Sequence, residues 1–167
     1  MKTIILGTAH LKSTPGKCSP DKKFFEYKYS RELCQAIKAI LQNMGYTVFI
    51  DIEDEDLKVT TNQELCLRCK VVNDLQKVYK NCIYVSIHVN AAGNGTKWMN
   101  ATGWSAYTSV GLTAADKLAE CLYDAAKKNL KDKKLRTDCL DKDSDIESNF
   151  YVLKHTLCPA VLTENFF

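Results

Sequence analysis

Apolar residues occur along this chain in two patterns: short β-branched runs and longer stretches with a helical period. The short runs predict strands, because continuous apolar, β-branched segments are typical of strands buried on both faces of a sheet. The clearest run, Cys-Ile-Tyr-Val-Ser-Ile-His, ends directly before a polar, glycine-containing segment. The predicted strands cover residues 2–6, 46–50, 82–88, 102–108 and 160–162.

Apolar positions that recur every three and four residues predict helices between these strands. The predicted helices cover residues 24–44, 61–79 and 112–130, and the short segment 150–157 is expected to form a helix or a turn. Gly45 follows the first helix, where glycine commonly ends a helix. The charged segments 51–56 and 138–145 are interpreted as solvated loops.

This alternation of strands and helices predicts an α/β protein with a twisted, mostly parallel sheet and helices on both faces. A chain of 167 residues can bury a substantial core, so we expect residues 1–167 to form a single catalytic domain.

Polar residues follow three of the apolar runs. His10 follows the first run, His88 ends the third, and Glu164 comes just after the last. Ligands of open α/β sheets bind beyond the carboxyl ends of the strands. The pattern therefore predicts two histidines and a carboxylate at one edge of the sheet.

His10 and His88, together with Glu26 in the first turn of the first helix, are candidate zinc ligands. Two histidines and a glutamate, with water in the fourth position, are a common ligand set for catalytic zinc. A zinc-bound water becomes a nucleophile at neutral pH, and Glu164 could then transfer its proton. The residues alone leave alternatives open: Glu26 could simply favour the helix dipole, and Glu164 could be a surface residue near a frayed terminus.

Net charge and the length of the apolar runs argue against some classes of function. The formal net charge of +3 makes no general case for nucleic-acid binding, and no apolar run approaches the length of a membrane span. The first residues are too short in their apolar part for a signal peptide. We therefore expect either a lysin made in the cytoplasm and released, or an exported protein whose signal has been removed.

The eight cysteines are irregularly spaced, and several lie inside predicted helices or strands. We expect free thiols rather than a disulfide framework. Cys66 and Cys69 form a C-x-x-C pair, for which half a zinc site, a redox pair or two packed helical thiols are the possible interpretations. The absence of a second pair at suitable spacing disfavours a zinc ribbon and favours simple packing.

The order of these residues closely resembles the zinc-dependent N-acetylmuramoyl-L-alanine amidases of bacterial cell-wall hydrolases and phage endolysins. The resemblance spans the whole chain. Two of its motifs are specific: Ser-Ile-His-Val-Asn-Ala at 86–91, and Pro-Ala-Val-Leu-Thr-Glu-Asn-Phe at 159–166. Arg68 with Asn73, and Gly103 with Tyr107, resemble further family signatures. The segment 14–20 resembles a loop of Bacteroides-type and phage members.

This resemblance implies a zinc site formed by His10, Glu26 and His88, with Glu164 as the catalytic carboxylate. It also implies hydrolysis of the amide between N-acetylmuramic acid and L-alanine of peptidoglycan. One departure is Leu11, where the family usually has glycine, so the loop is expected to take a different path.

Substrate contacts are less strongly indicated. Asn90, Lys97 and Trp98 lie in the polar loop after the third strand and could meet the glycan or the peptide, and Lys97 could pair with a stem-peptide carboxylate. Trp104 could stack on a sugar or belong to the core. We expect a monomer. Two rival functions stay open: a zinc peptidase that cuts within the stem peptide, and a non-catalytic peptidoglycan-binding module.

Overall fold

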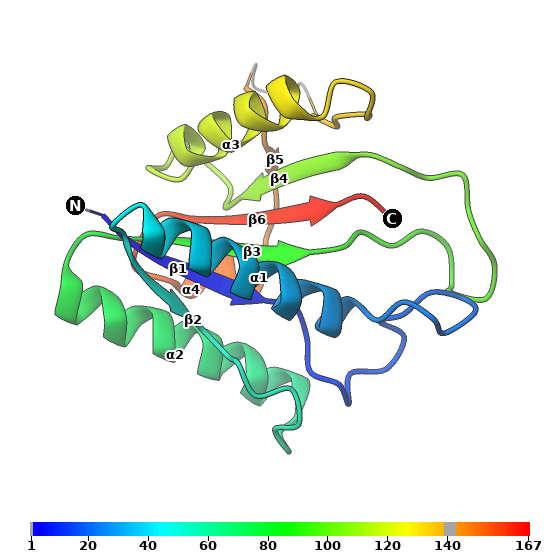
Figure 1. The fold of residues 1–167 in the computed structure, drawn as a ribbon, viewed down its shortest axis with the longest axis horizontal. Coiled ribbons are helices and arrows are strands. Elements are labelled where there is room, and N and C mark those ends of the chain that lie inside the picture. The colour runs from blue at the N-terminus through cyan, green and yellow to red at the C-terminus, as the bar shows by residue number, and fades with distance from the viewer. Residues whose placement is uncertain (1, 139–142) are drawn as a thin grey trace.

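The computed structural model describes residues 2–138 and 143–167, and its strands form one twisted sheet in the order β2-β1-β3-β6-β4-β5 (Figure 1). All neighbouring strands are parallel except β4 and β6, which are antiparallel. The strands are β1 (Thr3–Thr8), β2 (Thr47–Ile50), β3 (Cys82–His88), β4 (Trp104–Thr108), β5 (Ile146–Glu147) and β6 (Ala160–Asn165). The predicted mostly parallel α/β sheet is confirmed.

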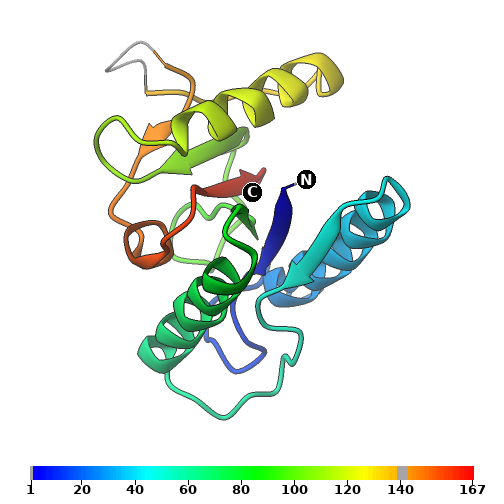
Figure 2. The same cartoon turned by 90° about the vertical axis from the view of Figure 1, so that its left-hand side faces the viewer.

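Helices cover both faces of this sheet, as predicted (Figure 2). One core cluster joins α2 and α4 to Ile5, Tyr84 and Leu162 on one face. On the other face, α1 packs on β1, β2 and β3, and α3 packs on β4 and β6. The helices are α1 (Glu26–Asn43), α2 (Thr61–Tyr79), α3 (Asp116–Asn129) and α4 (Tyr151–His155).

Several predicted boundaries were wrong by a few residues, and tertiary pairing explains the strand extensions. The first strand runs on to Thr8, because its last two residues pair with Ser86 and Ile87 of β3. The last strand runs on to Asn165, because it pairs with both β3 and β4. The helices predicted at 24–44 and 112–130 begin two and four residues later than expected, at Glu26 and Asp116.

Strand β5 was not predicted, because two residues carry no periodic pattern. It follows the segment 138–145, which was interpreted as a charged loop and of which residues 139–142 lie outside the described residues. The strand predicted at 102–108 begins at Trp104. None of the helices in the described ranges has the length and apolar character needed to cross a membrane.

Gly7 allows close packing near the end of β1. A Cβ atom at this position would lie 2.3 Å from the hydroxyl oxygen of Tyr84, which is fully buried. Because Gly7 has no side chain, the ring of Tyr84 can pack against the backbone near the end of β1.

The interpretation of 51–56 as a solvated loop was wrong for Asp51, which is buried. One of its carboxylate oxygens accepts hydrogen bonds from Arg68 at 2.7 Å and from the Tyr84 hydroxyl at 2.9 Å. The other accepts from the backbone N–H groups of Thr8 and Ile52. The sequence analysis missed the burial of Asp51 because this residue is the first of an acidic run, and such a run is typical of a solvated loop.

Arg68 completes this buried network from α2. Its guanidinium pairs with Asp51 and, at 2.8 Å, with Glu64 one turn earlier on the helix. Burial alone would lower the pKa of Arg68, but Asp51, Tyr84 and Glu64 outweigh it and raise the pKa. The network ties α2 to the end of β1, close to the segment that carries His10.

Arg68→Met is expected to destabilise the fold by about 3 to 5 kcal/mol, because it leaves the buried Asp51 and Glu64 carboxylates without their cation. Chemical denaturation of the purified protein measures this change. Lys70→Met is the control, since the exposed Lys70–Asp74 pair contributes at most about 1 kcal/mol. Equal losses in the two variants would contradict a special role for the buried pair.

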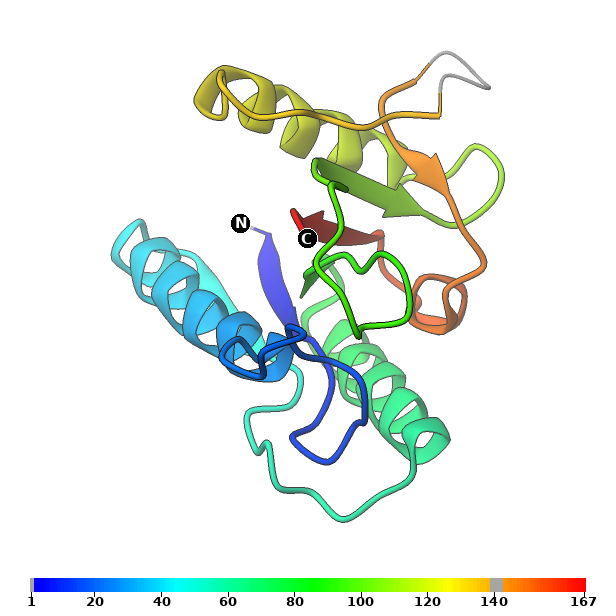
Figure 3. The same cartoon turned by 90° about the vertical axis from the view of Figure 1, so that its right-hand side faces the viewer.

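The carboxyl ends of β1, β3 and β6 meet at one edge of the sheet. Figure 3 looks onto this edge, where the loop that leads from β1 to α1 and the loop that leads from β3 to β4 lie in front of the strands. The predicted site residues lie at this edge.

Candidate active site

His10, Glu26 and His88 come from three segments and converge at this edge. His88 is the last residue of β3, Glu26 is the first residue of α1, and His10 lies two residues beyond β1. The donor atoms of the three side chains lie within 4.8 Å of one another. The three predicted metal ligands are therefore brought together, as the strand-end argument expected.

Glu26 lies between the two imidazoles. Its carboxylate oxygens are 3.1 Å from His88 Nδ1 and 3.5 Å from His10 Nε2. The backbone N–H of Val89 donates a hydrogen bond of 3.0 Å to the same oxygen that faces His88. The two rings stand edge to face, with centroids 5.1 Å apart. One buried carboxylate thus sets the orientation of the cluster.

The backbone around His10 is held by two residues of α1 that the sequence analysis did not single out. Arg31 donates hydrogen bonds to the carbonyls of Ala9 and His10, at 3.1 and 2.8 Å. Ser30 accepts from the Ala9 N–H and donates to the Ile87 carbonyl, which joins the ends of β1 and β3. These contacts stabilise the left-handed conformation of His10, whose φ is 47°.

Leu11 is the position where the resembling family usually has glycine. Its side chain is almost fully buried, and its N–H donates a hydrogen bond to the hydroxyl of Thr14. The turn after β1 is therefore anchored by an apolar side chain, and the imidazole of His10 still reaches Glu26.

The electrostatics of the cluster suit a cation. Burial lowers the pKa of His10 to about 3, so the imidazole is neutral and its nitrogen can donate an electron pair. Burial alone would raise the pKa of Glu26, but contacts with His88, His10 and the Val89 N–H lower it, so the carboxylate is charged. Two imidazoles and one anionic carboxylate are a donor set that zinc accepts.

Glu164 lies on β6 directly beside this cluster. In the parallel pairing of β3 and β6 its Cα partner is His88, and across the antiparallel pair its partner is Ser105. Because Glu164 belongs to a paired strand, the alternative of a surface residue at a frayed end does not hold. Paired residues on adjacent strands project to the same face, so the carboxyl group and the His88 ring share one side of the sheet.

The Glu164 carboxyl group is partly buried, and its Oε2 atom has no hydrogen-bond partner among the residues that the structure describes. Burial, with a smaller effect from the charge of Glu26, raises the pKa of Glu164 to about 8. The group therefore titrates close to neutral pH, which suits a residue that both accepts and donates a proton.

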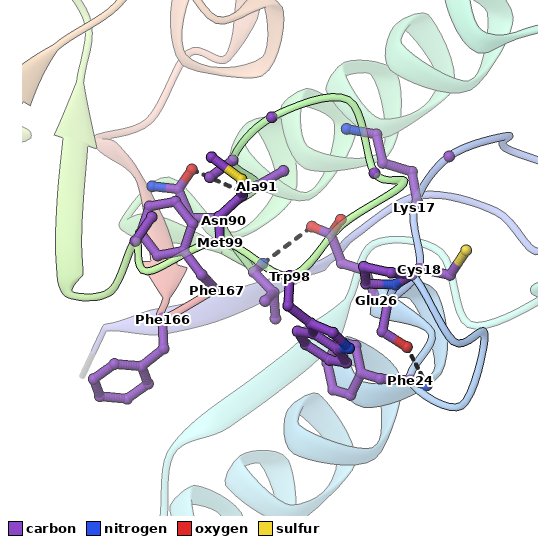
Figure 4. A pocket seen from close by; sticks show the side chains of 18 of the residues that line it. Lys17, Cys18, Phe24, Glu26, Asn90, Ala91, Trp98, Met99, Phe166 and Phe167 are labelled. Carbon is purple, nitrogen blue, oxygen red and sulfur yellow. Dashed lines mark hydrogen bonds between the residues drawn. The ribbon is translucent and has the colours of Figure 1, made fainter.

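A cavity of about 620 Å³ opens next to the cluster and shares Glu26 with it (Figure 4). Its walls are the loop before α1, the loop after β3 and the end of the chain. Asn90, Lys97 and Trp98, the predicted substrate contacts, all line it. The other larger side chains on its walls are those of Lys17, Phe24, Tyr29, Met99, Asn165, Phe166 and Phe167.

The two tryptophans have different environments. Trp98 is 69% exposed and lies at the cavity, whereas Trp104 is 6% exposed and packs against α3. The Trp104 indole N–H donates a 3.0 Å hydrogen bond to Asn165. Of the two interpretations of Trp104, the core one is confirmed.

Apart from Trp98, the aromatic side chains of the cavity wall were not predicted as part of the site. Phe24 lies just before α1 and Tyr29 in its first turn, and the sequence analysis placed both only within the predicted helix 24–44. Phe24 is 38% exposed, and an exposed aromatic residue at the start of a helix beside candidate ligands was the available signal.

The described cysteines are free thiols, as predicted. In the C-x-x-C pair, Cys69 packs in the core, whereas Cys66 is exposed on α2, 3.3 Å from the Tyr151 hydroxyl. Packing is therefore confirmed for Cys69 only. Among the described residues, neither thiol belongs to a cluster with metal-ligand geometry.

The fold and the site together define an α/β protein with a histidine–glutamate–histidine cluster, able to hold a metal ion, at the carboxyl ends of its parallel strands. The family model described as N-acetylmuramoyl-L-alanine amidase matches residues 4–167, so the chain belongs to this family. It is accordingly an enzyme that hydrolyses an amide bond of peptidoglycan.

Solved structures with the same fold span nearly the whole chain. The catalytic domain of CwlV from Bacillus (Paenibacillus) polymyxa var. colistinus has a TM-score of 0.77 at 22% identity, covering 99% of this chain and 80% of that one. CwlD from Clostridioides difficile, in complex with the GerS lipoprotein, has 0.78 at 21%, covering 100% and 83%. An amidase from Clostridium difficile 630 has 0.79 at 23%, covering 99% and 80%. No curated protein sequence gave a significant match.

Proposed function

We propose that residues 1–167 form one catalytic domain, a zinc-dependent amidase that cleaves the bond between N-acetylmuramic acid and L-alanine. The observation that carries the proposal is the position of Glu164, beside His88 in the strand register and next to the cluster of His10, Glu26 and His88. These three residues would hold the zinc ion, and the donor set described above fits it.

When bound, zinc would supply a Lewis acid that makes a water molecule nucleophilic and polarises the scissile carbonyl. Glu164 accepts a proton from the attacking water as the new carbon–oxygen bond forms. It then donates that proton to the L-alanine nitrogen as the carbon–nitrogen bond breaks. The products are the muramic acid carboxylate and the free amino group of the peptide, and Glu164 returns to its starting state.

The cavity next to the cluster is the proposed site for the rest of the substrate. Its aromatic wall, with Phe24 and Trp98, offers apolar faces for a sugar ring or a peptide side chain. Asn90 is anchored by the hydrogen bond from its own N–H to the Phe166 carbonyl, and it presents an amide to the cavity. Lys97 extends the wall on the loop after β3.

Because every proposed ligand and proton-transfer group comes from one chain, we propose that a monomer suffices for activity. The proposed partner is peptidoglycan itself, and the proposed place of action is the cell wall. The resemblance of segment 14–20 to Bacteroides-type and phage members makes a lysin or autolysin role part of this proposal.

Digestion of purified peptidoglycan tests the cleaved bond. We expect mass spectrometry to find glycan strands with free muramic acid carboxyl groups and intact stem peptides that begin with L-alanine. A zinc peptidase would instead leave L-alanine on muramic acid and release truncated peptides, and a binding module would sediment with peptidoglycan without releasing fragments. Either result would overturn the proposed reaction.

A further inference from the structure

The loop that leads into α1 holds Lys17 in a fixed position beside the metal-ligand cluster. The Lys17 carbonyl accepts a 3.1 Å hydrogen bond from the N–H of Glu26. The next residue, Cys18, forms an isolated antiparallel bridge with Phe25, and the Ser19 N–H donates to the Phe24 carbonyl. This small hairpin joins the backbone of Lys17 directly to that of a proposed metal ligand.

The Lys17 side chain is partly buried and lines the cavity, on the wall formed by this loop (Figure 4). Within the described residues, no carboxylate forms an ion pair with its ammonium group. Its charge nevertheless acts on the site, because it opposes the protonation of both His10 and Glu164. Lys17 therefore shares the cavity with Glu26, and none of the described carboxylates pairs with its ammonium group.

The surroundings of Lys17 indicate what kind of partner is missing. A partly buried ammonium is destabilised unless an anion or hydrogen-bond acceptors compensate it. Besides Lys17, the charged residues on the cavity wall are Lys97, which is also a cation, and Glu26, which the two histidines already engage. The compensating anion would therefore come from the ligand, and a compact ammonium suits a carboxylate.

We propose that Lys17 binds the carboxylate that lies closest to the scissile bond on the stem peptide. This inference rests on the proposed function. In a stem peptide, L-alanine is followed by a D-glutamate linked through its γ-carboxyl group, so the free α-carboxylate of this glutamate is the first anion after the cleaved amide. Walls in which this group is amidated to isoglutamine lack that charge, and Lys17 would make the enzyme discriminate between the two kinds of wall.

The test compares two synthetic substrates that differ only in this group. Both are N-acetylmuramoyl tripeptides of L-alanine, a γ-linked second residue and L-lysine amide, and the second residue is D-glutamate in one and D-isoglutamine in the other. We expect the wild type to favour the carboxylate substrate by about tenfold in kcat/KM, as for one charged hydrogen bond. Lys17→Met should bring the ratio of the two kcat/KM values near one.

Matched variants separate this role from a general effect of charge. Lys12→Met removes a cation from the same loop that pairs with Glu55 and Asp56 and does not line the cavity, so the preference should persist. Lys17→Arg should retain part of the preference. Loss of the preference in Lys97→Met but not in Lys17→Met would place the carboxylate on the other loop and overturn the inference. Equal losses on both substrates in Lys17→Met would overturn it too, because Lys17 would then act on the shared reaction.

A binding measurement keeps this inference separate from the proposed function. Calorimetric titration with the free peptides, L-alanyl-γ-D-glutamyl-L-lysine amide and its isoglutamine counterpart, does not require turnover. We expect wild type to bind the carboxylate peptide about tenfold more tightly, and Lys17→Met to bind both alike. Failure to cleave either substrate would contradict the proposed function alone, whereas equal binding of the two peptides by wild type would contradict the inference alone.

Discussion

Glu164→Gln is expected to lower kcat by a factor of about 10² to 10⁴, the usual contribution of a general acid–base group. Glutamine has nearly the same shape as glutamate, so it should keep the pairing of β6 with β3 and β4. It cannot accept the proton of the attacking water and return it to the leaving nitrogen. Release of soluble muropeptides from purified peptidoglycan measures the loss.

The zinc content of this variant should remain near that of wild type, because Glu164 lies beside the proposed ligands and is not one of them. Glu32→Gln is the matched control. Glu32 is exposed on α1 and pairs with Lys28 on the same helix, so the activity of the Glu32→Gln variant should match that of wild type. A Glu164→Gln variant with at least a tenth of wild-type activity would show that another group transfers the proton.

His88→Ala is expected to lose both zinc and activity. It removes one of three proposed ligands and leaves the buried carboxylate of Glu26 with one imidazole fewer. Substitution of a group that only orients a ligand weakens metal binding by about 10- to 100-fold, so loss of a ligand should exceed about 100-fold. Elemental analysis of purified protein, with wild type near one zinc per chain, measures the effect.

His155→Ala is the control for this substitution. His155 is an exposed residue of α4 that stacks on Tyr151, away from the cluster. The His155→Ala variant should keep wild-type zinc content and activity.

Removal of the metal from wild type by a chelator should abolish activity, and added zinc should restore it. A wild-type protein that binds no zinc after reconstitution would contradict the proposed cofactor.

The local pattern of the chain was sufficient for most elements. The prediction for 61–79 agrees with α2 at both ends, and the prediction for 82–88 agrees with β3. Thr60 and Gln63 form a capping box at the start of α2, so a local signal marked that boundary. Boundaries were missed where pairing between distant segments decided them, as at the ends of β1 and β6.

The candidate ligands were found because strand ends constrain position. Parallel strands that end at one edge bring His10 and His88 together whatever the detailed packing, and Glu26 follows from the helix that returns to that edge. The network of Asp51, Arg68 and Tyr84 was missed, because its partners are separated by 17 to 33 residues and charge alone suggested solvent.

The sequence by itself thus determined the α/β class, the order of the elements other than β5 and the candidate residues at the strand ends, because periodicity and connection order are local properties of a chain. Only the tertiary structure decided that Glu164 lies in a paired strand, that Trp104 is core and that Lys17 faces the cavity without an ionic partner among the described residues. Burial and pairing depend on which distant segments meet. Burial raises the pKa of Glu164, and the loop before α1 places Lys17 on the cavity wall. No local pattern encodes them.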